Sequence, residues 1–141
     1  MMKIAIINGP NLNLTGLREP DIYGQKSFDQ YIPWLFAQFP DHDIIYFQSN
    51  VEGELINMLH SCGGEQRAIL LNAGGYAHTS VALHDAIKAI GMPVIEIHLS
   101  NIAAREEFRH TSMIGRTCIG TIAGFGLDSY RLGILALENL A

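Results

Sequence analysis

The chain is poor in cysteine, in charge and in long apolar runs. Cys62 and Cys118 show no CxxC spacing and fall on apolar patterns, so we expect reduced, buried thiols in a cytoplasmic protein. Charged residues make up 16% of the chain, the net charge is -5 and long basic runs are absent, which argues against nucleic-acid binding. No apolar run approaches the ~18 residues of a membrane span, and the N-terminus lacks the sections of a signal peptide.

Metal and imine chemistry also find little support in the residues. The six histidines lack HExxH and HxH spacings, which counts against a metal hydrolase. Lys3 lies at a strand start and Lys88 on a helix, and only Lys26 lies near a candidate loop, so a lysine Schiff base is poorly supported. The residues therefore favour neither a metal hydrolase nor a lysine imine.

Apolar segments instead alternate with stretches of helical spacing. Strands are expected at 3–8, 43–50, 67–73, 94–99 and 117–123. Helices are expected at 27–39, from 51 to an end at Gly63–Gly64, from about 81 to 90, and after Gly126, with a short helical turn or loop at 102–110. This alternation predicts a single α/β domain, 1–141, with a flavodoxin-like five-stranded parallel sheet and helices on both faces.

Two local features bear on the first helix. Ser27 and Gln30 have capping-box spacing and should start it. Pro33 removes one helical hydrogen bond, so it should kink the segment or move its start.

Polar side chains follow three of the predicted strands at the points where these strands end. Open α/β sheets bind ligands at the carboxyl ends of their strands, so three such loops at one edge indicate a binding site. The residues are Asn8, Asn11 and Asn13 after the first strand, Asn72 and His78 after the third, and His98 and Ser100 at the end of the fourth.

Glu96 and His98 fall on one face of the fourth strand, because strand side chains alternate. A carboxylate and an imidazole in an apolar strand cost free energy unless they satisfy each other or act on a ligand. The pair is either a structural buried histidine with its partner, or a general acid or base whose tautomer Glu96 sets.

Tyr23 lies in the long loop after the first strand. Tyrosine titrates near ~10 and serves as a base at neutral pH only where cations stabilise its phenolate. Arg18 is five residues away, and Arg105 and Arg109 could add charge from one shared face. The residues alone favour a packing aromatic over a catalytic base.

Asp85 points away from the core side of its helix, since it follows Leu83 by two residues. It is either a solvated charge or a residue that reaches a second site across a subunit boundary. A flavin or nucleotide-binding module on the same fold remains an alternative, although Asn8-Gly-Pro-Asn-Leu-Asn13 does not have the form of a phosphate loop.

Collinear motifs from Lys3 to the last helix resemble type II 3-dehydroquinate dehydratases. They are Ile7-Asn-Gly-Pro-Asn-Leu-Asn-Leu14, Arg18-Glu-Pro-x-x-Tyr23-Gly24, Asn72-Ala-Gly-Gly-Tyr-Ala-His78-Thr-Ser80, Glu96-Ile-His98-Leu-Ser-Asn101 and Arg105-Glu-Glu-Phe-Arg109. Thr15, Pro33, Ala77 and His84 depart from the usual pattern, and none replaces a chemical residue.

The resemblance implies reversible dehydration of 3-dehydroquinate to 3-dehydroshikimate, a step of the shikimate pathway, without metal, cofactor or Schiff base. It also implies trimers assembled into a dodecamer, and a lid from about residue 18 to 25. The roles it implies are as follows: Tyr23 as base beside Arg18 and Arg105, Asn11 holding a water at the enolate, and His98, oriented by Glu96, as general acid. Asn72, Leu99 and Ser100 would bind the carboxylate, and His78, Arg109 and a neighbouring subunit's Asp85 the ring hydroxyls.

Overall fold

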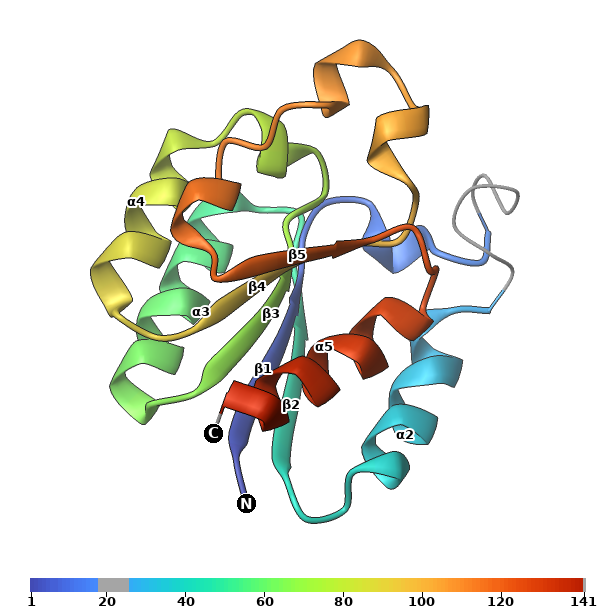
Figure 1. Ribbon diagram of the computed structural model, residues 1–141, viewed down its shortest axis with the longest axis vertical. Coiled ribbons are helices and arrows are strands. Elements are labelled where there is room, and N and C mark those ends of the chain that lie inside the picture. The colour runs from blue at the N-terminus through green and yellow to red at the C-terminus, as the bar shows by residue number, and fades with distance from the viewer. Residues whose placement is uncertain (18–25, 141) are drawn as a thin grey trace.

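A five-stranded parallel sheet forms the centre of the computed structural model, which describes residues 1–17 and 26–140 (Figure 1). Its strands are β1 (Lys3–Asn8), β2 (Asp43–Gln48), β3 (Ala68–Asn72), β4 (Val94–His98) and β5 (Gly120–Ala123). Their order is β2-β1-β3-β4-β5, and every neighbouring pair is parallel. The predicted flavodoxin-like fold is confirmed, although each strand after β1 is shorter than predicted.

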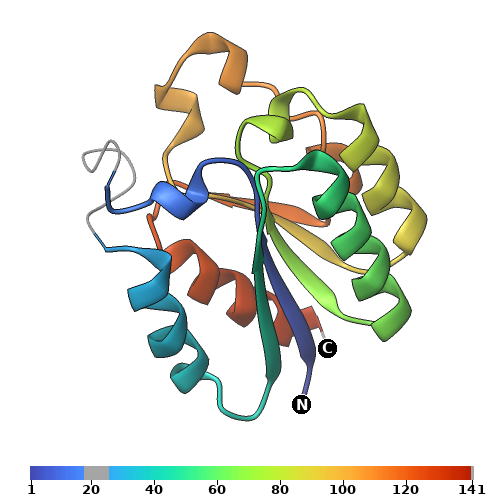
Figure 2. The same cartoon turned by 180° about the vertical axis from the view of Figure 1, so that it is seen from behind.

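Helices cover both faces of this sheet. They are α2 (Phe28–Gln38), α3 (Glu52–Glu65), α4 (Val81–Ile90) and α5 (Asp128–Leu140). Helices α2 and α5 pack on one face, and α3 and α4 on the other (Figures 1 and 2). Each face has its own apolar core, so the sheet is buried on both sides, as parallel sheets usually are.

The start of α2 follows the predicted capping box. The Ser27 hydroxyl accepts the Gln30 amide at 3.3 Å, and the Gln30 side chain accepts the Ser27 amide at 3.2 Å. Pro33 lies inside the helix and does not move its start. Since proline has no amide hydrogen, α2 lacks one helical hydrogen bond at this position.

The prediction that Gly63–Gly64 end the second helix is wrong. Helix α3 runs through both glycines to Glu65, and its C-cap residue Gln66 has a left-handed φ of 59°. A Cβ on Gly63 would lie 3.0 Å from the Cβ of Ile90, so this glycine allows α3 and α4 to pack closely. Its role is in helix packing, which the sequence of a single segment does not reveal.

The cysteines differ in their burial. Both are free thiols; Cys62 is buried in the core as predicted, whereas Cys118 is only partly buried. Cys118 directly follows a short 3-10 turn before β5, at the edge of the sheet, which explains its greater exposure.

Within residues 1–17 and 26–140, no helix has the length and apolar character needed to cross a membrane.

Candidate active site

The floor of the site is made where the loops after β1 and β3 touch. The Gly9 amide donates to the Asn72 carbonyl at 2.7 Å. A Cβ on Gly9 would lie 2.5 Å from the Ala73 carbonyl oxygen, and Gly74 has a φ of +61° and faces Pro10. Only glycine permits this approach, so the two glycines of these loops fix the distance between them.

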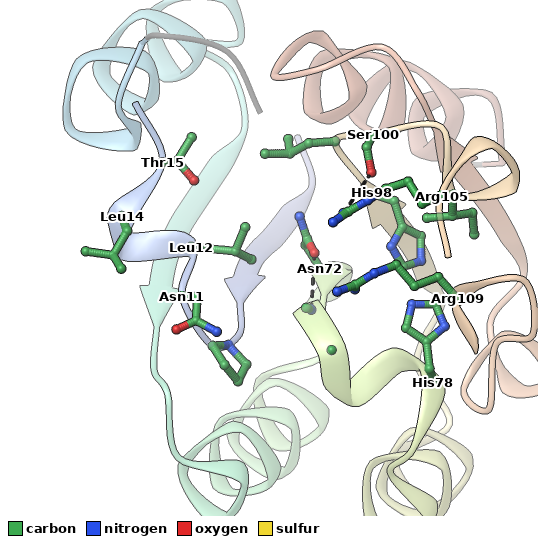
Figure 3. A pocket seen from close by; sticks show the side chains of 15 residues that line it. Asn11, Leu12, Leu14, Thr15, Asn72, His78, His98, Ser100, Arg105 and Arg109 are labelled. Carbon is green, nitrogen blue, oxygen red and sulfur yellow. Dashed lines mark hydrogen bonds between the residues drawn. The ribbon is translucent and has the colours of Figure 1, made fainter. Parts of the chain in front are cut away.

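A pocket opens above this floor at the carboxyl edge of the sheet (Figure 3). Its wall combines the loop after β1, the loop after β3 and the segment that follows β4. The predicted site residues that line it are Asn11, Asn72, His78, His98, Leu99, Ser100, Arg105 and Arg109. The three loops meet at one edge, as expected from the sequence, through Asn11, Asn72, His78, His98 and Ser100.

Glu96 and His98 form a buried pair below the pocket. His98 Nε2 lies 2.5 Å from Glu96 Oε2, and the side chain of His98 is 7% exposed and that of Glu96 1%. Burial alone would raise the pKa of Glu96, but hydrogen bonds from His98, Ser112 and Thr121 and the charge of His98 lower it below the usual value. Glu96 is thus an anion that engages one ring nitrogen, which leaves the other for a ligand.

Asn72 belongs to a directional network of buried side chains. The Tyr130 hydroxyl donates to Asn8 Oδ1 at 2.7 Å and accepts from Asn72 Nδ2 at 3.0 Å. Asn72 Oδ1 in turn accepts the Gly74 amide at 3.3 Å. With its oxygen committed to the backbone, Asn72 offers the pocket its remaining N–H, a donor suited to an anionic oxygen.

Two arginines supply positive charge to the same pocket. The guanidinium groups of Arg105 and Arg109 extend toward the side formed by Asn72 (Figure 3). Arg105 donates to the Ser100 hydroxyl at 3.3 Å, and Arg109 donates to Glu106 at 2.7 Å. Arg105 directly follows the 3-10 turn Ile102–Ala104, and Arg109 ends the turn Glu107–Arg109. The two arginines therefore do not share one helical face, yet both reach the pocket.

His78 lies against the ring of His98. The ring centroids are 5.8 Å apart with an interplanar angle of 24°. His78 Nδ1 is 2.8 Å from the Thr111 carbonyl oxygen, which can only accept, so Nδ1 carries a proton. With Nδ1 committed to this backbone bond, His78 has Nε2 left for a ligand hydroxyl.

Other candidate residues lie away from the pocket wall. Asp85 is exposed on α4, where its carboxylate is 2.9 Å from the His84 ring. Asn8 is buried beneath the site, and Asn13 accepts a 3.5 Å hydrogen bond from Gln48. Arg18 and Tyr23 fall outside the described residues, so the structure does not locate them.

Sequence reasoning missed three hydroxyl residues that support the site. Ser112, Thr121 and Tyr130 reach Glu96 or Asn72 from segments distant in the sequence. Neither spacing nor periodicity marks them, because a hydroxyl in a loop, a strand or an apolar helix face is ordinary. Only the tertiary arrangement shows their partners.

The arrangement defines a flavodoxin-like α/β protein with an acid–base site for a small anionic, hydroxylated ligand. Amide and guanidinium donors suit a carboxylate, and the carboxylate–imidazole pair can transfer a proton. Among the described residues no group of three or more His, Cys, Asp or Glu side chains could hold a metal.

Comparison with known proteins identifies the family. Residues 2–138 match the family model "Dehydroquinase class II", and the chain belongs to this family. A 3-dehydroquinate dehydratase of Carboxydothermus hydrogenoformans is 53% identical over 138 residues, covering 96% of this chain and 90% of that protein. The crystal structure of a type II dehydroquinase from Propionibacterium acnes superposes with a TM-score of 0.94 at 35% identity, covering 99% of this chain and 97% of that one. The corresponding structure from Butyrivibrio crossotus gives 0.93 at 37% identity, with 97% of both chains covered.

Proposed function

We propose that the chain catalyses the reversible dehydration of 3-dehydroquinate to 3-dehydroshikimate, in the shikimate pathway. The observation that carries this proposal is the buried Glu96–His98 pair beneath a pocket with two arginines, in a chain of the class II dehydroquinase family. The substrate is a cyclic hydroxylated carboxylate with a ketone. Its C2 proton is acidified by that ketone, so removal of this proton gives an enolate.

Tyr23 is the proposed base. As a phenolate stabilised by Arg18 and Arg105, it takes the C2 proton, and the electron pair moves into the enolate. Asn11, on the pocket wall, holds a water that donates to the enolate oxygen. Closure of the segment from about 18 to 25 over the substrate would exclude bulk water from this step.

His98 is the proposed general acid. The enolate collapses, the C1–C2 double bond forms, and the C1–oxygen bond breaks. His98 delivers a proton to the departing hydroxyl, which leaves as water. Glu96 supports this role because its anionic carboxylate stabilises the protonated imidazole and fixes the ring.

Substrate recognition follows the polarity of the wall. We assign the carboxylate to Asn72, the Ser100 hydroxyl and the backbone of Leu99 and Ser100, and the ring hydroxyls to His78 and Arg109. The remaining Asn72 N–H, and His78 Nε2, the ring nitrogen that is not bonded to Thr111, can bind these partners.

Assembly of the chain is part of the same proposal. We expect one domain, 1–141, that forms trimers and then a dodecamer, so that Asp85 reaches a neighbouring subunit's site. Its outward position on α4 supports this assignment, since a buried Asp85 could not cross a boundary. Two free thiols are compatible with a cytoplasmic location.

The test is the ultraviolet absorbance of the purified protein with 3-dehydroquinate and excess chelator. Formation of the conjugated enone of dehydroshikimate raises the absorbance. We expect a rise that persists after borohydride treatment in the presence of substrate, because no lysine imine forms. No rise from folded protein would contradict the dehydratase, and borohydride inactivation would replace the tyrosine route with a lysine route.

A further inference from the structure

Glu96 has two hydroxyl partners besides His98. Ser112, in the segment that leads to β5, lies 2.7 Å from Oε2, and Thr121 in β5 lies 3.2 Å from Oε1. Gly115 closes a further side, since a Cβ there would lie 3.1 Å from Oε1. Both oxygens of this buried carboxylate are therefore held by groups from other parts of the chain.

The surroundings of these hydroxyls make them donors to Glu96. Ser112 Oγ accepts the Gly115 amide at 3.0 Å, so its own proton is available to the carboxylate. An ionised carboxylate can only accept hydrogen bonds, so Thr121 must donate as well. Each of these bonds favours the charged form, against the opposing effect of burial.

We propose that Ser112 and Thr121 are positioning residues that hold Glu96, and through it the acid His98. By engaging both carboxylate oxygens they keep Glu96 anionic and in place to bind His98 Nε2, so that the second ring nitrogen stays directed at the pocket. This inference rests on the proposed dehydration, which gives His98 its acid role.

The other groups around the pair lie mostly on the pocket side. His78 stacks on His98, and the cationic Arg105 and Arg109 share its pocket. The Cys118 thiol is neutral, since burial first and the charge of Glu96 second raise its pKa to about 12. Glu96 is thus the anion that offsets these cations beneath the imidazole.

Thr121 allows a clean test because its side chain is exposed in β5 and forms no part of the apolar core. Thr121→Val keeps the β-branched shape and removes only the hydroxyl, whereas Thr121→Ser keeps the hydroxyl. We expect Thr121→Val to lower kcat about fivefold and to leave KM within about twofold of the wild-type value, because one hydrogen bond is lost. Thr121→Ser should retain activity. Thr117→Val is the matched control, because the Thr117 hydroxyl donates to the Ile114 carbonyl.

A second readout needs no activity. A carboxyl whose pKa is lowered by folding stabilises the fold above its unfolded pKa and loses this contribution as the pH falls through the folded-state value. The Tm deficit of Thr121→Val should therefore be full at pH 7 and shrink as the pH falls below 4.5, the usual glutamate value. A deficit caused by loss of a hydrogen bond to an uncharged acceptor, as expected for Thr117→Val in the 3-10 turn before β5, stays constant with pH.

The outcomes separate this inference from the proposed function. Wild-type kcat in Thr121→Val, equal losses in the Val and Ser variants, or a Tm deficit independent of pH would each overturn the positioning role. The wild-type protein could be inactive while Thr121→Val still shows the pH-dependent Tm deficit. That result would contradict the proposed dehydration and leave the positioning of Glu96 by Thr121 standing.

Discussion

The hydroxyls of Tyr130 and Tyr31 lie in contrasting environments. Tyr130 is fully buried between two amides, and burial raises its pKa strongly. Tyr31 is also buried, and within the described residues its hydroxyl has no hydrogen-bond partner. Tyr23, in the motif with Arg18, is the one that we assign to chemistry.

Removal of the Tyr23 hydroxyl should abolish the base. Tyr23→Phe is expected to lower kcat by at least about 100-fold while substrate still binds, because only the proton acceptor is lost. Steady-state kinetics and a binding titration measure the two effects. Tyr76→Phe, a change in the loop after β3, is the control, and near-normal turnover by Tyr23→Phe would refute the assignment.

Loss of the Tyr130 hydroxyl should cost stability and substrate affinity together. Tyr130→Phe removes the hydroxyl partner of Asn8 Oδ1 and Asn72 Nδ2, so we expect a loss of about 2 kcal/mol in the free energy of unfolding and a raised KM. Urea unfolding and kinetics measure these changes. Tyr31→Phe removes a hydroxyl with no partner among the described residues and should cost nothing, and equal losses in both variants would show that the network has no special role.

At the scale of secondary structure elements, the site is positioned by a backbone contact between the loops after β1 and β3. Gly9 in the loop after β1 meets the loop after β3, with 2.5 Å between a hypothetical Cβ and the Ala73 oxygen. Gly9→Ala should push these loops apart, lower the free energy of unfolding by about 2 kcal/mol and reduce activity.

The control for this change is Gly53→Ala. Gly53 lies in α3, and a methyl group there would meet no other described part of the chain within 4 Å, so alanine should raise stability by about 0.5–1 kcal/mol. Chemical denaturation compares the two variants. A Gly9→Ala protein as stable and active as wild type would mean that the loops can separate freely.

The sequence predicted these elements well where periodicity and end signals agree, as at β1 and the capped start of α2. It failed where tertiary contacts decide, as at Gly63, which α3 retains in order to pack on α4. Strand ends in a parallel sheet share an edge, which made five pocket residues predictable: Asn11, Asn72, His78, His98 and Ser100. The partners of Glu96 and Asn72 were not, since they come from distant segments.

At the scale of the whole molecule, the exposed position of Asp85 bears on the proposed assembly. Asp85→Ala should raise KM several-fold without unfolding the subunit, because the charge is exposed on α4 and would act on a neighbouring site. Kinetics and the mass in solution test this together. Asp85→Asn, which keeps size and loses charge, shows whether charge matters, and wild-type Michaelis kinetics in both variants would rule the role out.

The contact between the loops after β1 and β3 also bears on redesign. Because the hydrogen bond from Gly9 to Asn72 joins main-chain atoms, the spacing of the two loops does not depend on the side chains that face the ligand. A library at Arg109 would therefore test which small acid the proposed site accepts while this main-chain contact is kept, whereas Asn11 has a left-handed φ of 70° that few other side chains adopt. The chain is a starting point for new specificity that needs no redesign of its fold.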